Sequence, residues 1–233
     1  MSSSRFAGKV LEPICGTPSI LFMVARARRA AMLDEVKVVT SVDASDEPLA
    51  ALLEAHDVPF FRGSLDDVLS RYVAAAEESG AEIVVRLTGD CPLIDPAIID
   101  GVVRLLVDSG ADYASNIDPP SYADGLDVEC FTRAALDRAH REARLPPERE
   151  HVTLWMRTEA AGLDRRNLAA IADSSRLRLT VDYPDDLEVV RGLVDMLGGR
   201  EAEFDQYDMM RALDRKRDLL QRNRHLRNEA LNQ

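Results

Sequence analysis

The stretch "VVRLTGDCPLIDP", residues 84–96, joins an apolar run to an aspartate that follows it closely. Its β-branched opening is typical of a buried strand, and Asp90 comes just after Gly89, at the expected carboxyl end of that strand. Asp95 followed by Pro96 is typical of a helix start, with an N-cap residue and a proline at the first helical position. A carboxylate at the mouth of a buried strand is costly unless a cation meets it. The stretch therefore predicts a strand, a turn that faces a ligand, and a helix.

Strand-like and helix-like runs alternate on both sides of this stretch in the first half of the chain. The expected strands lie at 36–40, 58–61, 83–87 and 112–115, and the expected helices near 18–31, 46–55, 65–79 and 96–109. Such alternation predicts an α/β fold with a mostly parallel, doubly wound sheet and helices on both of its faces. Ligands of such sheets bind at the carboxyl ends of the strands.

The second half is less regular. Its expected strands are 128–131 and 177–181, and its expected helices lie near 132–144, 150–160, 184–197 and 206–228. The proline and glycine breaks at 118–125 and 145–148 are typical of loops and not of domain linkers. We therefore expect one main domain over residues 1–205, followed by an arginine-rich helical arm over 206–233.

Composition and charge limit the classes of protein that the chain can represent. It has 233 residues, of which 46% are hydrophobic and 30% charged, with a net charge of −12. This acidic balance disfavours a nucleic-acid partner, and no run of about 18 apolar residues predicts a membrane span. The three cysteines form no C-x-x-C pair, so we expect no disulfide framework and a cytoplasmic location.

The N-terminal stretch "SSSRFAGK", residues 2–9, is a candidate phosphate loop. It combines small residues with the two cations Arg5 and Lys9 ahead of an expected helix. Backbone N–H groups of such a loop can surround phosphate oxygens while the cations neutralise them. The spacing is not that of a Walker loop, and a flexible basic N-terminus is the alternative interpretation.

A second strand-end aspartate lies in "RLTVDYPDDLEVV", residues 178–190. The alternation of this stretch predicts a strand with one apolar face that ends at Asp182. Asp185 and Asp186 fall in the first turn of the next helix, where the helix dipole favours acids. A turn or capping role is the alternative for both Asp90 and Asp182. Two such carboxylates on one crevice repel each other without a cation, which predicts Mg²⁺ between them.

The stretch "DGLDVECF", residues 124–131, offers two further acids. On a strand Asp127 and Glu129 share one face, where they can accept hydrogen bonds from sugar hydroxyls. The alternative is a solvated edge strand. The four histidines are scattered, so the sequence predicts neither a zinc site nor a hydrolase triad.

In this order the motifs resemble the cytidylyltransferase family typified by the spore-coat polysaccharide protein SpsF, which is related to the synthetases of CMP-activated keto-deoxy-octulosonate and CMP-sialic acid. The resemblance also covers "FRGSLDDVLSRY" at 61–72 and "REHVT" at 149–153, and it is poor only over roughly the last thirty residues. It implies a GT-A-like nucleotidyltransferase fold that binds CTP and Mg²⁺.

The resemblance also implies roles for individual residues. The nucleotide and its phosphates would be bound by Ser3, Ser4, Arg5, Gly8, Lys9, Ser64, Asp67 and Arg71. Lys9, Asp90 and Asp182 would be catalytic, with the two aspartates as metal ligands. Asp127, Glu129 and His151 would lie toward the sugar.

The implied reaction is transfer of CMP from CTP to an acidic sugar, with release of pyrophosphate, in surface polysaccharide biosynthesis. Asp127 and Glu129 would repel a sugar carboxylate, so we expect an arginine such as Arg149 or Arg178 to bind it. One alternative is a GT-A glycosyltransferase that uses a sugar nucleotide, although its usual D-x-D is Gly89-Asp90-Cys91 here. The other is a catalytically silent nucleotide-binding homologue. The oligomeric state stays open, with a homodimer as one option.

The N-terminus departs from the resemblance. In the family an apolar strand precedes the loop that matches residues 2–9, whereas here only Met1 does. A first strand is central in a doubly wound sheet, and its loss leaves backbone groups unpaired on both sides. We therefore expect the natural protein to begin roughly ten residues upstream. The chain as written is then expected to be less stable and weaker in binding CTP.

Overall fold

The computed structural model describes residues 6–199 and 203–226 of the chain. The predicted phosphate-binding residues Ser3, Ser4 and Arg5 lie outside the described residues, as does the end of the predicted terminal helix. No helix in the described part is both long and apolar enough to cross a membrane.

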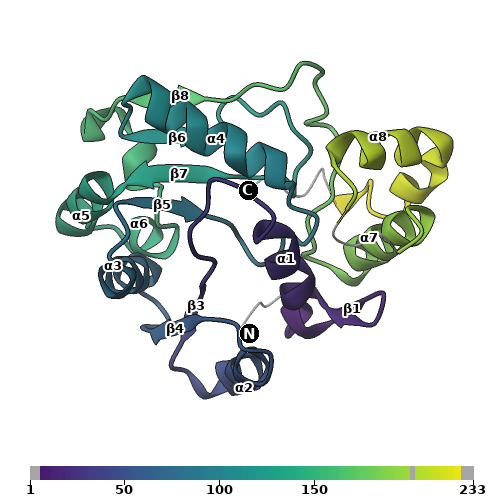
Figure 1. Ribbon diagram of the computed structural model, residues 1–233, viewed down its shortest axis with the longest axis horizontal. Coiled ribbons are helices and arrows are strands. Elements are labelled where there is room, and N and C mark those ends of the chain that lie inside the picture. Colours follow the sequence, from purple (N-terminus) through teal and green to yellow (C-terminus); the bar gives the residue numbers. More distant parts are fainter. Residues whose placement is uncertain (1–5, 200–202, 227–233) are drawn as a thin grey trace.

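Besides a short hairpin, the described strands form two separate sheets (Figure 1). In the smaller one, β3 (Val38–Ser41) runs parallel to β4 (Phe60–Gly63). The larger one has the order β5-β7-β6-β8. Its strands are β5 (Ile83–Arg86), β6 (Tyr113–Ser115), β7 (Glu129–Thr132) and β8 (Arg165–Asn167). Strand β7 is antiparallel to both neighbours, while β8 is parallel to β6, so the predicted α/β class is confirmed with one reversed strand.

The helices follow the predicted alternation through the first half of the chain. Their bounds are α1 (Ser19–Ala27), α2 (Glu47–Ala55), α3 (Val68–Ser79), α4 (Pro96–Ser109), α5 (Arg133–Glu142), α6 (Pro146–Glu150), α7 (Pro184–Met196) and α8 (Gln206–Arg215). The predicted cap of α4 is confirmed, because the Asp95 carboxylate accepts a hydrogen bond of 2.7 Å from the Ala97 N–H. A short hairpin of β1 (Pro13–Ile14) and β2 (Thr17–Pro18) precedes α1.

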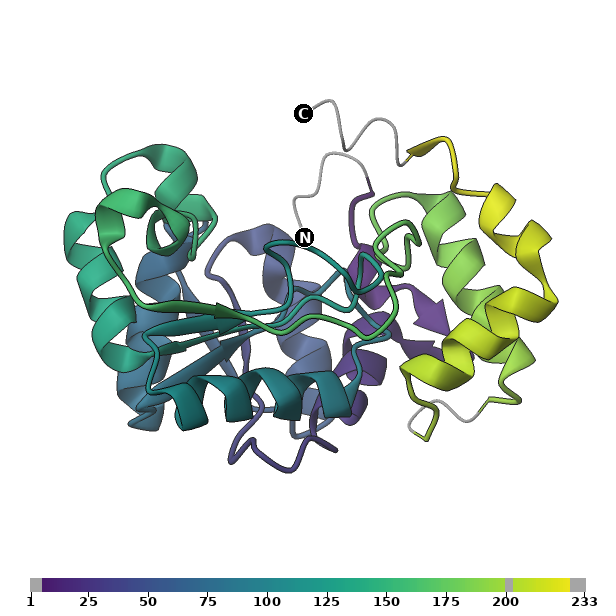
Figure 2. The ribbon, with the colours of Figure 1, turned by 90° about the horizontal axis from the view of Figure 1, so that it is seen from above.

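The larger sheet is covered on both faces. On one face, α4 packs Ile98, Val102 and Leu106 into the main hydrophobic core. On the other face, Tyr113 and Phe131 pack against α3, α5 and the turns that follow α6. Figure 2 shows the teal helix α4 below the strands and the green helices above them. This layering is what the apolar faces of the helices require, since each must be buried against the sheet.

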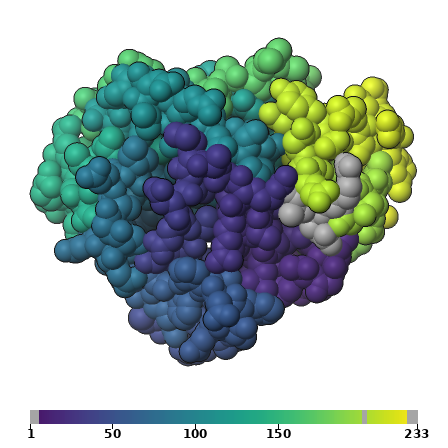
Figure 3. Space-filling view, viewed as in Figure 1, coloured from purple at the N-terminus to yellow at the C-terminus, as the bar shows by residue number. Residues whose placement is uncertain are grey.

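The two sheets are not joined to each other by backbone hydrogen bonds in the described residues. No described strand links β3 to β5, so the two sheets remain separate. Val36, just ahead of β3, packs against both the main core and the small cluster around α2. Figure 3 shows a narrow opening between the purple N-terminal residues and the blue residues near α2. The two parts of the molecule are therefore held together by side-chain packing and not by a continuous ladder.

The prediction of a regular strand over 177–181 is wrong. The segment is extended, but its only ladder contact among described residues is an isolated parallel bridge between Asp124 and Arg178. Its backbone N–H groups bond to two loops: Leu179 to the Asp124 carbonyl at 2.7 Å and Val181 to the Asp90 carbonyl at 2.8 Å. The alternation therefore identified an extended segment correctly, but its partners are loops.

One strand was not predicted, and two predicted helices need correction. The short strand β8 has the sequence Arg-Arg-Asn, which lacks the apolar alternation that predicts a strand. The predicted helix over 150–160 is instead a pair of 3₁₀ turns, 155–157 and 159–161, because Thr158 caps the second turn and Gly162 ends it. The predicted helix over 206–228 ends at Arg215 and gives way to a 3₁₀ turn, 217–221. That break lets Leu219 pack into the main core beside α7.

Gly125 is required where its loop crosses the 177–182 segment. Its φ is +104°, and a Cβ there would lie 2.5 Å from the Thr180 nitrogen and 2.6 Å from the Leu179 carbonyl carbon. We expect Gly125→Ala to lower the free energy of unfolding by about 3 kcal/mol or more, because the backbone must move. Urea unfolding measures this loss. Gly110→Ala is the matched control, because its φ is +66° with no atom within 4 Å, and it should cost only about 1 kcal/mol.

Candidate active site

The cation that meets Asp90 is the ammonium group of Lys9. Lys9 Nζ lies 3.2 Å from Asp90 Oδ2 and 2.8 Å from Asp182 Oδ1. The structure thus brings together all three residues that were predicted to be catalytic. Gly89 lets the turn that carries Lys9 come close to Asp90, since a Cβ at Gly89 would lie 3.3 Å from Val10 Cγ1 in that turn. Gly8, just ahead of that turn, has a φ of +72°, a conformation that glycine adopts without strain.

Backbone hydrogen bonds hold the two aspartates against each other. The Asp90 carbonyl accepts hydrogen bonds from the Val181 N–H at 2.8 Å and from Thr180 Oγ1 at 3.1 Å. The turn after β5 is therefore tied directly to the segment that ends at Asp182. Two carboxylates so fixed repel each other, and the Lys9 ammonium offsets that repulsion.

Arg178 organises the other side of Asp182. Its guanidinium donates to Asp182 Oδ2 at 3.1 Å, to Asp186 Oδ1 at 2.9 Å and to Asp124 Oδ2 at 3.1 Å. Burial alone would lower the pKa of Arg178, but the three carboxylates raise it above its ordinary value. The side chain is 6% exposed, so this is a buried and permanently charged centre.

The interpretation of Asp186 as a residue that merely matches the helix dipole is incomplete. Asp186 is fully buried, and its Oδ2 accepts hydrogen bonds from the backbone N–H groups of Asp182 and Tyr183 at 3.0 and 3.1 Å. It also accepts a hydrogen bond of 2.9 Å from Asn223 Nδ2. Asp186 thus fixes both the backbone of Asp182 and the guanidinium beside it. Sequence reasoning missed this because the pattern does not show that the side chains of Arg178, in the same stretch, and of the more distant Asn223 turn toward Asp186.

Two further acids lie near this centre with raised pKa values. Burial, reinforced by the charges of Asp124, Glu129 and Asp90, raises the pKa of Asp127 to about 7. Burial also raises the pKa of Asp124, although Arg178 acts in the opposite direction. The predicted group of Asp90, Asp127 and Asp182 is therefore an acidic centre whose charge is only partly compensated by cations.

Glu129 lies in the interior of the sheet, so the alternative of a solvated edge strand is wrong. It is 3% exposed, on β7 between β5 and β6. Its carboxylate pairs with Arg86 on one neighbouring strand and accepts a hydrogen bond of 2.6 Å from Tyr113 Oη on the other. Both oxygens of Glu129 thus already have donors within the protein.

The remaining predicted residues gather at the start of α3. Asp67 caps that helix by accepting from the Ser70 N–H at 2.9 Å, and Ser64 Oγ accepts from the Asp67 N–H at 3.1 Å. Arg71 is on the same helix, where burial lowers its pKa and its Nε has no partner among the described residues. His151, just after α6, is exposed.

The arginines that we expected to bind a sugar carboxylate are already paired. Arg149 lies 2.5 Å from the Asp67 carboxylate and donates to the His140 carbonyl at 2.9 Å. Arg178 is shared among three aspartates. Because both guanidinium groups are engaged with the protein, neither fits the role that the sequence suggested.

The raised pKa of Asp127 predicts a pH-dependent loss of stability. Its carboxyl group stays protonated to about pH 7 in the folded state but ionises near pH 4 in the unfolded state. Stability therefore falls as pH rises from about 4 to 7, and the penalty is complete above that range. We expect Asp127→Asn to raise the free energy of unfolding on the order of 2 kcal/mol at pH 8 without divalent metal, and very little at pH 4.

Urea titrations at both pH values measure this difference. Asp108→Asn, at an exposed position on α4, is the matched control and should not alter the pH dependence. An equal effect of Asp127→Asn at pH 4 and pH 8 would contradict the assigned pKa.

Two curated relatives cover most of the chain. The chain is 31% identical over 207 residues to the spore coat polysaccharide biosynthesis protein SpsF of Bacillus subtilis, covering 86% of this chain and 85% of that protein. It is 30% identical over 230 residues to a 3-deoxy-manno-octulosonate cytidylyltransferase of Anaeromyxobacter, covering 82% and 93% of the two chains.

A solved structure and a family model agree with these relatives. The structure of a cytidylyltransferase from Leptospira borgpetersenii superposes with a TM-score of 0.89 at 31% identity, covering 95% of this chain and 93% of that chain. The family model described as cytidylyltransferase matches residues 1–224. The resemblance that the motifs indicated is thus confirmed. The chain belongs to the cytidylyltransferase family and is a CTP-dependent nucleotidyltransferase.

Proposed function

We propose that this enzyme transfers CMP from CTP to an acidic sugar, with release of pyrophosphate, in a cytoplasmic step of surface polysaccharide biosynthesis. The observation that carries the proposal is the Lys9 ammonium held between Asp90 and Asp182, at the carboxyl end of β5. The names of the relatives support the sugar class, since one makes spore-coat polysaccharide and another acts on 3-deoxy-manno-octulosonate.

Asp90 and Asp182 are suited to hold Mg²⁺. Within the described residues no group of three or more His, Cys, Asp or Glu side chains is arranged to hold a metal ion. Mg²⁺ does not need such a cage, because it is typically bound by one or two carboxylates together with waters and substrate phosphates. The two aspartates already face one cation, the Lys9 ammonium. When bound there, Mg²⁺ would offset charge on the α-phosphate and orient its oxygens.

The protein's own residues then do the positioning. Lys9 neutralises phosphate oxygens from its place between the aspartates, and Ser3, Ser4, Arg5 and Gly8 complete the proposed phosphate loop. Arg178 holds the Asp182 carboxylate in place, and Asp186 holds the Asp182 backbone N–H. A sugar hydroxyl oxygen forms the new bond to the α-phosphorus while the bond from that phosphorus to the β-phosphate oxygen breaks.

Two further groups of residues take the remaining proposed roles. Ser64, Asp67 and Arg71, at the start of α3, lie toward the nucleotide. Asp127, Glu129 and His151 lie toward the sugar. In this arrangement Glu129 acts through Arg86 and Tyr113, which both bond to its carboxylate.

Pyrophosphate release from CTP tests the reaction class. We expect release with Mg²⁺ and one member of a panel of sugar acids that includes 3-deoxy-manno-octulosonate, and none with neutral hexoses. CTP should be preferred over dTTP. Binding of CTP without release for any sugar would instead identify a silent homologue. Release of a nucleoside diphosphate from a sugar nucleotide would identify a glycosyltransferase.

Asp90→Asn tests the proposed metal carboxylate. The change is nearly isosteric, and we expect kcat to fall on the order of a hundredfold or more, because a charge that acts in the transition state is lost. The fold should persist, as judged by circular dichroism and melting temperature. Asp108→Asn is again the control, with turnover unchanged. Turnover of Asp90→Asn within a few-fold of the unmodified enzyme would overturn the assignment.

A further inference from the structure

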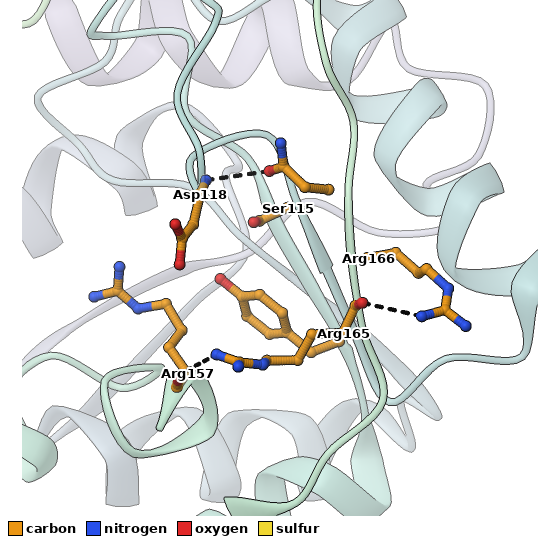
Figure 4. A pocket seen from close by; sticks show the side chains of 7 residues that line it. Ser115, Asp118, Arg157, Arg165 and Arg166 are labelled. Carbon is orange, nitrogen blue, oxygen red and sulfur yellow. Dashed lines mark hydrogen bonds between the residues drawn. The ribbon is translucent and has the colours of Figure 1, made fainter. Parts of the chain in front are cut away.

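A polar pocket lies between the end of the larger sheet and the turns that follow α6. It has a volume of about 250 Å³. Its lining residues, most of them polar or cationic, are Tyr113, Ser115, Asp118, Arg157, Arg165, Arg166 and Asn167 (Figure 4). None of them was among the candidate site residues of the sequence, and only Tyr113, which bonds to Glu129, has a role in the proposed transfer so far. The lining holds three arginines and one aspartate, so the ion pairs of the arginines decide which of them can meet a ligand.

Arg157 is the arginine of this pocket that the protein leaves available. Its Nε is buried and has no hydrogen-bond partner among the described residues. Arg165, by contrast, pairs with Glu159 at 2.6 Å and donates to the Arg157 carbonyl. Arg166 pairs with Asp164 at 2.5 Å. A buried guanidinium donor without a partner is costly, which favours a ligand that supplies an acceptor.

The opposite wall of the pocket is formed by the loop after β6. Figure 4 shows the side chains of Asp118 and Arg157 extending toward each other, yet no ion pair joins them in the described part of the chain. Asn167 holds the loop in place, because it accepts from the Asp118 N–H at 3.1 Å and donates to the Pro119 carbonyl at 3.0 Å. The space between the two charged groups is therefore bounded by a fixed loop and suits a molecule with both acceptors and hydroxyl donors.

A chain of contacts leads from the pocket to β5, the strand that precedes Asp90. Tyr113 lines the pocket and donates through Oη to Glu129 at 2.6 Å, and Glu129 pairs with Arg86. In the register of the sheet, Arg86, Glu129, Ser115 and Asn167 lie side by side across β5, β7, β6 and β8. Side chains in register share one face of a sheet. A polar row thus runs along this face from the strand that leads to Asp90 to the strand that borders the pocket.

We propose that this pocket binds the carboxylate of the acidic sugar and that Arg157 is its partner. This inference rests on the proposed function, because it places the acid group of that reaction's second substrate. An arginine can hold a carboxylate through two parallel hydrogen bonds. Arg149 and Arg178 are unsuited because both are paired with aspartates. The exposed Asp118 carboxylate then accepts hydrogen bonds from sugar hydroxyls.

Steady-state kinetics of Arg157→Gln give the first test. We expect the KM for the sugar acid to rise about 10- to 100-fold, the loss typical of a charge-assisted hydrogen bond. The KM for CTP should stay unchanged, and Arg157→Lys should recover part of the loss. Arg141→Gln, an exposed arginine on α5, is the matched control without effect. An unchanged KM for the sugar acid in a folded Arg157→Gln enzyme overturns the proposal.

The carboxamide of the same sugar separates charge recognition from general damage. In the unmodified enzyme the acid should be preferred over the carboxamide, and Arg157→Gln should lose that preference by the same factor by which its KM rises. A rise in KM that is equal for both compounds would contradict a contact between Arg157 and the carboxylate.

A binding measurement keeps this test independent of turnover. In ¹⁵N NMR spectra, the Nε–H signal that disappears in Arg157→Gln identifies Arg157. We expect that signal to shift on titration with the sugar acid in the presence of CTP and Mg²⁺, and not with its carboxamide. The ligand is the most active sugar acid of the panel, or 3-deoxy-manno-octulosonate if none releases pyrophosphate. A shift without turnover supports the pocket while the proposed reaction fails, and an absent shift overturns the pocket whatever the turnover.

Discussion

The arrangement of the site depends on the ion pairs that the buried Arg178 guanidinium makes with three aspartates. The guanidinium bonds to Asp182 and Asp186, which follow it in the chain, and to Asp124, which comes from a distant loop. Removing one partner of such a buried pair leaves an uncompensated charge, at a typical cost of about 3–5 kcal/mol. Asp182 can therefore point one oxygen at Lys9 because its other oxygen is fixed by Arg178.

The site as a whole carries more acid than the protein neutralises. Lys9 lies between Asp90 and Asp182, Arg178 serves three aspartates, and Arg86 serves Glu129. Asp127 has no ion pair in the described residues, and its pKa is raised to about 7 by burial and by neighbouring acids. The proposed divalent cation and the donors of a bound substrate would supply the positive charge that such a centre lacks.

The sequence predicted those parts of the fold and of the site that depend on residues within one short stretch. The motif around Asp90 gave its strand, its turn and the cap of α4 correctly, because these depend on neighbours in sequence. Asp186 was misinterpreted because its partners Arg178 and Asn223 meet it only in the folded chain. Neither strand β8 nor the position of Arg157 in a pocket could be predicted. The sequence Arg-Arg-Asn has no strand pattern, and both features depend on packing beside β6.

The contacts of Lys9 also have a kinetic meaning. They join residues that are 81 and 173 positions apart, and both depend on a segment that crosses the loop at Gly125. Contacts between such distant parts of a chain close large loops, and they form late because the entropy of closure must be overcome first. Recovery of catalysis after dilution from denaturant should thus lag behind recovery of helical circular dichroism. During refolding of this protein, the return of enzymatic activity therefore follows the formation of the last contacts.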